Sequence, residues 1–444
     1  MIDREQVVIV GAGPYGLSIA AHLNGLGVRC RIFGTPMQTW REHMPKGMLL
    51  KSDGFASNLS DPNSAFTLKD YCEQRGIAYD HTRIPVPLDV FISYGIEFQK
   101  RFAPQLEDRQ VVDIQSDPDG FKIKLDHGEV VYSQKVVVAV GISHFQYLPP
   151  SLSHLPANLV SHSSTFTDLE PLRGKNVTVV GAGASGLDLS ALLHEGGVNV
   201  TLLSRNPEVH FHDAPGTKPR SIWSQMRHPA SGIGPGLRSR FYTDAPLLFR
   251  YLPQSMRIKI VKTHLKPAAG WPMKERVLGR VPILLGYSIQ KAEAQNGKVR
   301  LDLTGQDGSQ KEHLTELVIS ATGYKVDLRR LAFLRGELQS QIRSVENSPV
   351  LSSDFQSSVP GLYFVGVTAA NSFGPVLRFA FGANFAARHI AKHLAKSLGL
   401  GRSHRSLQRS SAGGGLLESS APLASELGQE TASISTADGH KKSM

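Results

Sequence analysis

Two stretches of this chain share one order of residues: a short apolar run, a glycine-rich turn, and the start of a helical pattern. The first is Val7–Gly16, where VVIV is followed by GAGPYG, and the second is Val177–Gly186, where VTVV is followed by GAGASG. A short run rich in β-branched residues predicts a buried parallel strand. The turn that follows favours glycine, because a residue without a Cβ can turn there without a clash. Each stretch therefore predicts a strand, a tight turn and a helix.

The spacing G-x-G-x-x-G between a strand and a helix is typical of a dinucleotide-binding site. In the first copy, Gly11 turns the chain, Gly13 lets the backbone approach a pyrophosphate, and Gly16 lets the helix pack on the strand. The helix N-terminus then offers free N–H groups to the phosphates. One such motif alone is weak evidence, but two copies in one chain predict two dinucleotide sites.

The strand after each helix indicates which dinucleotide binds. These strands are Val28–Phe33 and Val198–Leu203. An Asp or Glu usually ends this strand and binds the ribose hydroxyls. The first copy has Gly34 at that place and leaves the ribose contact unassigned, whereas the second has Ser204 and Arg205. Because an arginine there suits a 2′-phosphate, we predict NADPH at the second site, in preference to NADH, and FAD at the first.

The rest of the pattern is that of an α/β protein with two Rossmann-like dinucleotide-binding domains. Apolar strands that end in glycine are expected at the carboxyl edge of a sheet, where ligands bind in this fold class. A long loop is expected at 39–62, where Trp40 and Met48 either cover a flat ring or pack under the loop. The other expected elements are a helix over 86–102, strands at 110–114, 121–125, 129–132, 135–141, 299–303, 314–320 and 360–366, and a helix over 376–394 after Gly374.

Composition and charge exclude several classes of function. The two cysteines, Cys30 and Cys72, allow neither a disulfide framework nor a C-x-x-C redox pair. The sequence contains no apolar run long enough to span a membrane, and we expect neither a signal peptide nor an export route, so a cytoplasmic location is favoured. No metal site is expected, since His210 and His212 lie in one loop without a third cluster nearby.

The formal net charge of +11 is concentrated in one segment, 214–280, where Asp244 and Glu275 oppose many lysines and arginines. Three readings stay open: attraction of an anionic cofactor or substrate, contact with a membrane surface, and a solvated basic face. We interpret the segment as a lid or a substrate channel, with a peripheral membrane or oligomer surface as the competitor. Nucleic acid is not expected, because no recognised binding module accompanies the charge.

With these motifs the chain resembles the class B flavoprotein monooxygenases. The resemblance covers about 7–394 and consists of the two glycine motifs, the loop with Trp40 and Met44-Pro45-Lys46-Gly47-Met48, Ala321-Thr322-Gly323-Tyr324, and Gly361–Gly366. Asp61–Thr67 is similar to the Asp-Pro-x-Ser-x-Phe-Thr segment of the ornithine and lysine N-hydroxylases. The resemblance implies an FAD-binding domain made of 1–168 and 325–396, with an NADPH-binding domain inserted at 169–324. A disordered tail is expected at 397–444.

The resemblance implies an oxidoreductase that consumes NADPH and O2. Reduced FAD would form a C4a-hydroperoxide that transfers one oxygen atom to a small nucleophilic substrate, by N- or S-oxygenation; a deprotonated peroxide would attack a ketone instead. The protein would orient the reactants and exclude water. Two alternatives stay open: a reductase that passes electrons to a quinone or protein acceptor, and a degenerate nucleotide-binding protein with a regulatory role. The oligomeric state and the substrate are not assigned.

The candidate residues fall into two groups. Lys51 and Asn58 in the long loop are the catalytic candidates near the flavin or substrate, although either could be a solvent-facing loop residue. The candidate cofactor contacts are Gly11, Gly13, Pro14, Tyr15, Gly16, Trp40, Met48, Val112, Gly141, Gly181, Gly183, Ser185, Gly186, Ser204, Arg205, Thr322, Gly323, Tyr324, Gly366 and Gly374.

Overall fold

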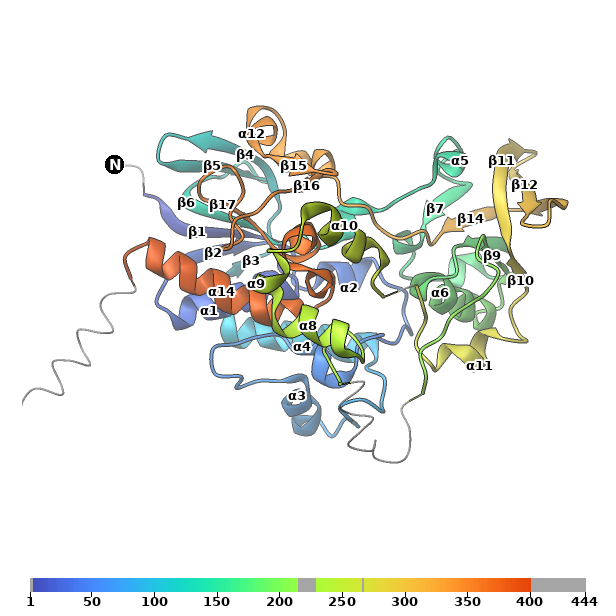
Figure 1. Ribbon diagram of the computed structural model, residues 1–444, viewed down its shortest axis with the longest axis horizontal. Helices are drawn as coiled ribbons and strands as arrows, with labels where there is room; N and C mark the ends of the chain where they lie inside the picture. Colours follow the sequence, from blue (N-terminus) through green and yellow to red (C-terminus); the bar gives the residue numbers. More distant parts are fainter. Residues whose placement is uncertain (1–2, 215–228, 266, 401–444) are drawn as a thin grey trace, which may run out of the picture. The chain divides into compact units, whose positions relative to one another are not determined.

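The computed structural model describes residues 3–214, 229–265 and 267–400 (Figure 1). Its first sheet takes strands from both ends of this range. The strands are β1 (Glu5–Val10), β2 (Cys30–Phe33), β3 (Leu106–Glu107), β4 (Val111–Asp117), β5 (Gly120–Leu125), β6 (Val130–Val138) and β17 (Leu362–Phe364). The order is β3-β2-β1-β6-β5-β4, and β17 pairs in parallel with the second half of β6. The α/β fold class is thereby confirmed.

The second sheet takes its strands from the middle of the chain. It contains β7 (Val160–His162), β8 (Asn176–Val180), β9 (Asn199–Ser204), β10 (Ile283–Leu285) and β14 (Leu317–Ser320), in the order β10-β9-β8-β14-β7 with every pair parallel. An antiparallel meander of β11 (Tyr287–Gln295), β12 (Lys298–Gly305) and β13 (Gln310–Thr315) packs on it through Val299, Leu301 and Leu303. A short pair, β15 (Ser344–Val345) and β16 (Ser348–Pro349), lies outside both sheets.

Helices cover these sheets and bury separate cores. The described helices are α1 (Pro14–Gly25), α2 (Gln38–Glu42), α3 (Leu68–Gln74), α4 (Leu88–Phe102), α5 (Pro150–Ser153), α6 (Ala184–Glu195), α8 (Leu237–Asp244), α9 (Pro246–Phe249), α10 (Gln254–Thr263), α11 (Met273–Val277), α12 (Glu337–Gln341), α13 (Ala370–Phe373) and α14 (Gly382–Ser397). In Figure 1, α1 and α14 run alongside each other below the first sheet. α6 packs on β8 and β9. None of the described helices is long and apolar enough to cross a membrane.

Three expected elements differ from the structure. β6 is one continuous strand, whereas two strands were expected at 129–132 and 135–141. Ser133, at the expected break, lies where the partner of β6 changes from β5 to β17. It is buried, and its hydroxyl donates to the Lys135 carbonyl (2.7 Å). The loop at 39–62 contains α2 and a 3-10 turn at Gly54–Ser57. The last helix begins at Gly382 instead of Val376.

Tyr15 explains why the last helix begins late. Its hydroxyl lies 3.1 Å from the Leu377 carbonyl oxygen and 2.8 Å from that of Phe379, so it holds this stretch just before the helix. A Cβ at Gly382 would lie 2.4 Å from the Tyr15 hydroxyl. The first glycine turn is thereby joined to the C-terminal segment that precedes α14.

The basic segment contributes to two cores. Tyr242 of α8 and Phe249 of α9 are buried with the first sheet, whereas Met273 and Val277 of α11 are buried against α6 and the second sheet. Lys218, Arg220, Arg227 and Lys266 of this segment lie outside the described residues, as do 401–444 of the expected tail. The domain boundaries at 168 and 324 stay a prediction; β7 lies before the first of them and pairs with β14.

The Asp61–Thr67 motif has a structural role. The Asp61 carboxylate, which is 1% exposed, accepts backbone N–H groups from Asn63 (3.0 Å), Ala65 (2.9 Å) and Phe66 (3.3 Å). Thr67 then caps α3 in a capping box with Asp70. The turn therefore fixes where α3 begins and seats Phe66 under Arg101, whose guanidinium lies 3.9 Å from the ring centroid.

Asp61→Ala should lower the free energy of unfolding by about 1 to 3 kcal/mol, because buried N–H groups lose their acceptor. Urea unfolding followed by circular dichroism measures the change. Asp119→Ala is the control, since Asp119 is exposed and touches Arg4 only at 3.5 Å. Equal stability of the two variants would contradict a structural role for Asp61.

Candidate active site

The first glycine turn has the geometry expected of a phosphate cradle. Gly11 has φ +109°, and a Cβ there would lie 2.4 Å from the Ala139 carbonyl oxygen. A Cβ at Gly16 would lie 1.9 Å from the Gly11 oxygen, so only glycine lets α1 start this close to β1. By contrast, a Cβ at Gly13 would meet no atom within 4 Å. The open space at Gly13 faces the N-terminus of α1 and fits a pyrophosphate.

The second turn repeats this geometry. Gly181 has φ +114°, and its Cβ would lie 2.6 Å from the Ala321 oxygen. A Cβ at Gly186 would lie 1.8 Å from the Gly181 oxygen, whereas one at Gly183 would only touch Pro267 at 3.4 Å. The residues of both turns therefore fit a dinucleotide, and the two sites are built in the same way.

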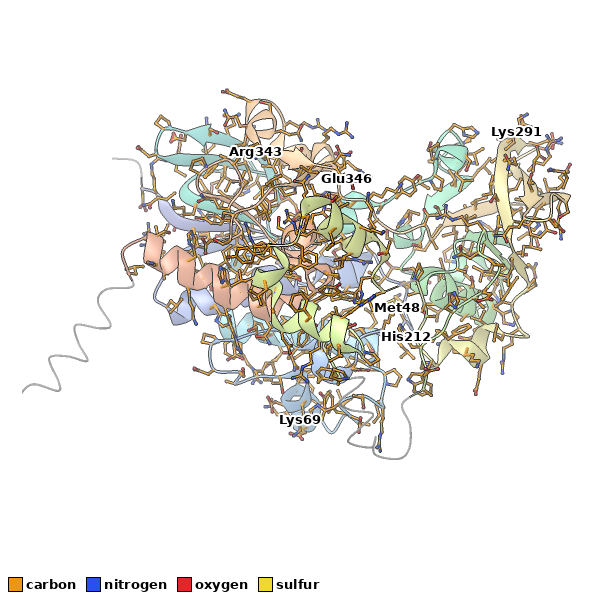
Figure 2. All side chains as sticks on the ribbon, viewed as in Figure 1. Met48, Lys69, His212, Lys291, Arg343 and Glu346 are labelled. Carbon is orange, nitrogen blue, oxygen red and sulfur yellow. The ribbon has the colours of Figure 1, made fainter. Side chains whose placement is uncertain are left out.

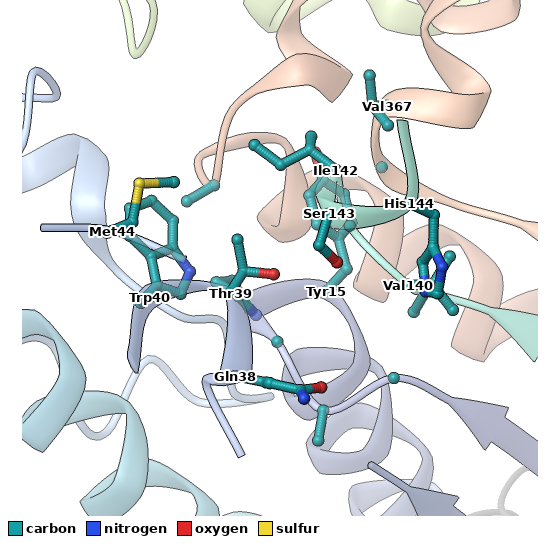
Figure 3. Close-up of a pocket in the computed structure, with 18 of the residues that line it drawn as sticks. Tyr15, Gln38, Thr39, Trp40, Met44, Val140, Ile142, Ser143, His144 and Val367 are labelled. Carbon is teal, nitrogen blue, oxygen red and sulfur yellow. The ribbon is translucent and has the colours of Figure 1, made fainter. Parts of the chain in front are cut away.

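Both turns border one cavity of about 350 Å³. Its walls come from the first glycine turn, the end of β2, α2 and the loop after it, the ends of β6 and β17, and the start of α6. The catalytic candidate Lys51 lines it, together with nine candidate cofactor contacts: Gly11, Gly13, Pro14, Tyr15, Trp40, Met48, Gly141, Ser185 and Gly366. Figure 3 shows Trp40 and Met44 together on one side of this cavity, with Tyr15, Ser143 and His144 on the other. The cavity thus joins the two phosphate cradles.

The loop after α2 supplies a mainly apolar wall. Trp40 packs edge to face on Phe91, with ring centroids 4.8 Å apart, and so is fixed against α4. Met44 and Met48 continue the wall, followed by Lys51. Asn58 does not line the cavity; its amide donates to the Phe55 carbonyl (3.1 Å) and accepts from the Leu68 N–H (2.8 Å). These bonds make Asn58 a brace of the loop.

After β2, where an acid is usual, the chain has Gly34 followed by uncharged polar residues. Gly34 has φ +132°, and a Cβ there would lie 3.3 Å from the Ala12 nitrogen, because the chain passes close over the first turn. Thr35 and Gln38 line the cavity just beyond it. The Gln38 amide donates to Glu42 (2.8 Å), which leaves its carbonyl oxygen available to a ligand.

Two of the remaining candidates, Val112 and Gly374, lie away from the cavity wall. Val111 lines the cavity, whereas Val112 points outward and is 45% exposed. Gly366 has φ +72° and its Cβ would lie 3.6 Å from the Tyr15 ring. Gly374 has φ +97° and contacts Phe249 of the first core instead. Neither Val112 nor Gly374 is among the residues that form the cavity wall.

The candidates of the second half lie at the carboxyl edge of the second sheet. Ser204 ends β9 and accepts the Asn206 N–H (3.1 Å), and the Arg205 side chain is exposed beyond it. Thr322 donates to the Tyr147 carbonyl (2.5 Å), and the Gly323 carbonyl accepts bonds from Tyr147 and His162 (3.0 Å each). Tyr324 packs edge to face on His162, with centroids 5.0 Å apart. Residues 322–324, which follow β14, therefore attach the second sheet to the segment that follows β6.

The charged groups of the cavity wall are perturbed by burial. Burial lowers the pKa of Lys51, an effect that Asp188 opposes and Arg378 reinforces. Burial raises the pKa of Asp188 to about 7, against the influence of Arg276 and Lys51. Burial also lowers the pKa of His144. The Lys51 ammonium helps to lower the pKa of His212, and Figure 2 shows Met48 and His212 at this junction of the two halves.

Sequence reasoning missed several wall residues, among them Gln38, Ser143, Asp188 and Arg378. Asp188 could have been found, because it follows Ser185 by three residues and so shares its face of the helix. Arg378 could not, since it was expected in a regular helix and lies in a 3-10 turn.

Several known proteins resemble this chain in sequence. The family described as pyridine nucleotide-disulphide oxidoreductase matches residues 8–223. The indole-3-pyruvate monooxygenase YUCCA1 of Oryza sativa subsp. japonica is 26% identical over 403 residues, which is 83% of this chain and 87% of that protein. A ferredoxin–NADP reductase of Parvibaculum lavamentivorans is 30% identical over 42% of this chain and 48% of its own length.

A solved structure shows the same fold over its whole length. The ornithine N-hydroxylase KtzI of Kutzneria sp. 744, described with reduced FAD, NADP+ and L-ornithine, superposes with a TM-score of 0.70 at 17% identity, over 89% of this chain and all of that chain. With two dinucleotide cradles opening on one cavity, the chain is an FAD- and NADP-dependent oxidoreductase that fits the class B flavoprotein monooxygenases.

Proposed function

We propose that this protein uses NADPH and O2 to add one oxygen atom to a nucleophilic nitrogen or sulfur of a small substrate. The observation that carries the proposal is the shared cavity: the N-termini of α1 and α6 border one space, so two dinucleotides held there would meet at their reactive ends. The likeness to a monooxygenase over most of both chains supports oxygenation. The fold of an ornithine N-hydroxylase supports nitrogen as the acceptor.

FAD, when bound, would accept a hydride from NADPH and activate O2. The chain holds and encloses the reactants. Gly13 and the N–H groups of α1 would bind the FAD pyrophosphate, and Gln38 its ribose. Trp40, Met44 and Met48 would cover the apolar ring system and exclude water. At the second site, Gly183 and Ser185 would bind the NADPH pyrophosphate, and Arg205 its 2′-phosphate.

The reductase alternative has less support. The ferredoxin–NADP reductase matches this chain over about half of its length. A dithiol mechanism does not fit either, since Cys30 and Cys72 are free and buried and burial raises the pKa of both thiols.

The proposal extends to where the enzyme works. A cytoplasmic location follows from the sequence, and the basic segment offers a peripheral contact with an anionic membrane. The exposed Leu237, Leu248 and Tyr251 support that contact, and the same segment carries the exposed cations Arg238 and Lys259.

The ratio of oxygenated product formed to NADPH consumed tests the proposal. The FAD-loaded protein, supplied with NADPH, O2 and a panel of amines and thioethers, should form one oxygenated product per NADPH with at least one of them, while releasing little H2O2. Mass spectrometry with ¹⁸O2 identifies the product oxygen. Product oxygen from water, or rapid reduction of a quinone or ferredoxin without oxygenation, would show that the reductase alternative is correct.

A matched pair of variants tests which dinucleotide each glycine turn binds. Gly13→Ala should lower the FAD content of the purified protein, because its backbone angles suit alanine and the new methyl fills the phosphate space. Gly183→Ala should keep FAD and weaken NADP+ binding, with roughly a tenfold higher Kd. Flavin absorbance and calorimetry measure these effects. If both variants lost the same cofactor, the assignment of the two sites would be wrong.

Arg205 should set the preference for NADPH. Arg205→Ala should weaken NADPH binding by about 1.5 to 3 kcal/mol, the cost of a lost charge-assisted hydrogen bond, and leave NADH binding unchanged. Arg173→Ala is the control, since Arg173 is also exposed but pairs with Glu170. An Arg205→Ala variant that keeps its NADPH preference would refute this role.

A further inference from the structure

One carboxylate faces the cavity. Among the described residues that line it, Asp188 is the acidic one, while Lys51 and Arg378 are cationic. Asp188 lies on α6 four residues after Ala184 and three after Ser185, which places the three residues on one face of the helix. At 1.5 Å per residue, Asp188 is only about 6 Å along the axis from the helix start. The carboxylate therefore lies close to the second phosphate cradle.

The cations near Asp188 do not neutralise it by direct contact. Within the described part of the chain, Asp188 has neither a hydrogen bond nor an ion pair. Arg276 of α11 is held by Glu195, with nitrogen–oxygen distances of 2.7 and 2.6 Å. Lys51 acts from the facing loop through the cavity, and both cations lower the pKa of Asp188 less than burial raises it. The carboxyl group is thus poised to be either ionised or protonated near neutral pH.

We propose that Asp188 takes up one proton when an NADP dinucleotide binds. The inference rests on the proposed NADPH site at Gly183 and Ser185. Phosphates bound there bring negative charge within about two helical turns of Asp188, and like charges favour the protonated form of a carboxyl group. The incoming dinucleotide also displaces water from the cavity, which further disfavours the ionised carboxylate. As an acid, Asp188 could donate a hydrogen bond to the dinucleotide instead of repelling it.

The direction in which NADP+ affinity changes with pH follows from the linkage between proton binding and dinucleotide binding. Burial raises the pKa of Asp188 to about 7 in the free protein, and the bound dinucleotide raises it further. Below the free pKa the group is protonated in both states, so affinity does not change. Above it, binding requires proton uptake, and the Kd rises by up to about tenfold per pH unit until the bound pKa is reached. NADP+ should therefore bind less tightly as the pH rises from 7 to 9.

Other titrating groups face this region and must be separated from Asp188. They are Lys51 on the loop, His212 after β9 and the 2′-phosphate of the ligand, while Arg276 and Arg378 stay charged. A phosphate monoester titrates near pH 6, so measurements above pH 7 exclude its contribution. Burial and Lys51 lower the pKa of His212, so it is neutral in this range. Lys51→Gln should keep the proton uptake but move it to higher pH, since Lys51 favours the ionised carboxylate.

Calorimetry of the FAD-loaded protein with NADP+ tests the proposal without turnover. Titrations at pH 8 in HEPES and in Tris, which differ in ionisation enthalpy, should give uptake of close to one proton per NADP+ by the wild-type protein. Asp188→Asn should take up none, show a Kd that is flat from pH 7 to 9, and bind NADP+ more tightly than wild type at pH 8.5. Asp89→Asn, an exposed carboxylate near the start of α4, is the matched control and should behave as wild type.

The possible results distinguish a failure of the Asp188 proposal from a failure of the proposed NADPH site. NADP+ binding to wild type without proton uptake, or uptake that persists in Asp188→Asn, would overturn the role of Asp188 and leave the proposed NADPH site intact. Absence of NADP+ binding at every pH would overturn the site itself. The gain of affinity expected for Asp188→Asn at high pH cannot come from a loss of folding.

Discussion

The contact between a helix start and a strand end is the constraint on which both sites depend. At Gly16 and at Gly186, a Cβ would lie within 2 Å of the carbonyl oxygen of the first glycine of the motif. Helix and strand can therefore approach this closely only because these residues lack a side chain. The close approach aims the unpaired N–H groups of α1 and α6 into open space, and the phosphates of a dinucleotide can occupy that space.

Positioning the two cradles at one cavity requires contacts made far along the chain. Tyr15 in the first motif reaches the carbonyls of Leu377 and Phe379, so the N-terminal turn and the C-terminal segment hold each other. Thr322 and the Gly323 carbonyl connect the second sheet to Tyr147, in the segment that follows β6. The Asp61 turn secures the far end of the long loop. The cavity wall thus depends on hydrogen bonds outside the wall itself.

The part of the site that sequence predicts well is the part that is local. A strand, three glycines and a helix lie within ten residues, and their geometry is that expected in both copies. The roles of the loop residues were harder to predict. Lys51 and Asn58 lie in the same loop, but of these two only Lys51 lines the cavity. Which side chain faces inward there depends on the acceptor at Phe55 and the donor at Leu68, which no pattern reveals. Likewise, the register shift in β4 next to Val112 decides that Val111 faces the cavity.

The cavity suits a reaction in which the cofactors carry the chemistry. Its wall is largely apolar, and its charged groups are few, so water would be excluded around a bound flavin. A lone carboxylate in such a place is costly when ionised, and burial accordingly favours its neutral form. Because Asp188 shares a helix face with the second phosphate cradle, its charge and the charge of a bound dinucleotide cannot be independent. If α6 binds the phosphates as proposed, the same helix would also couple dinucleotide binding to the protonation of the cavity.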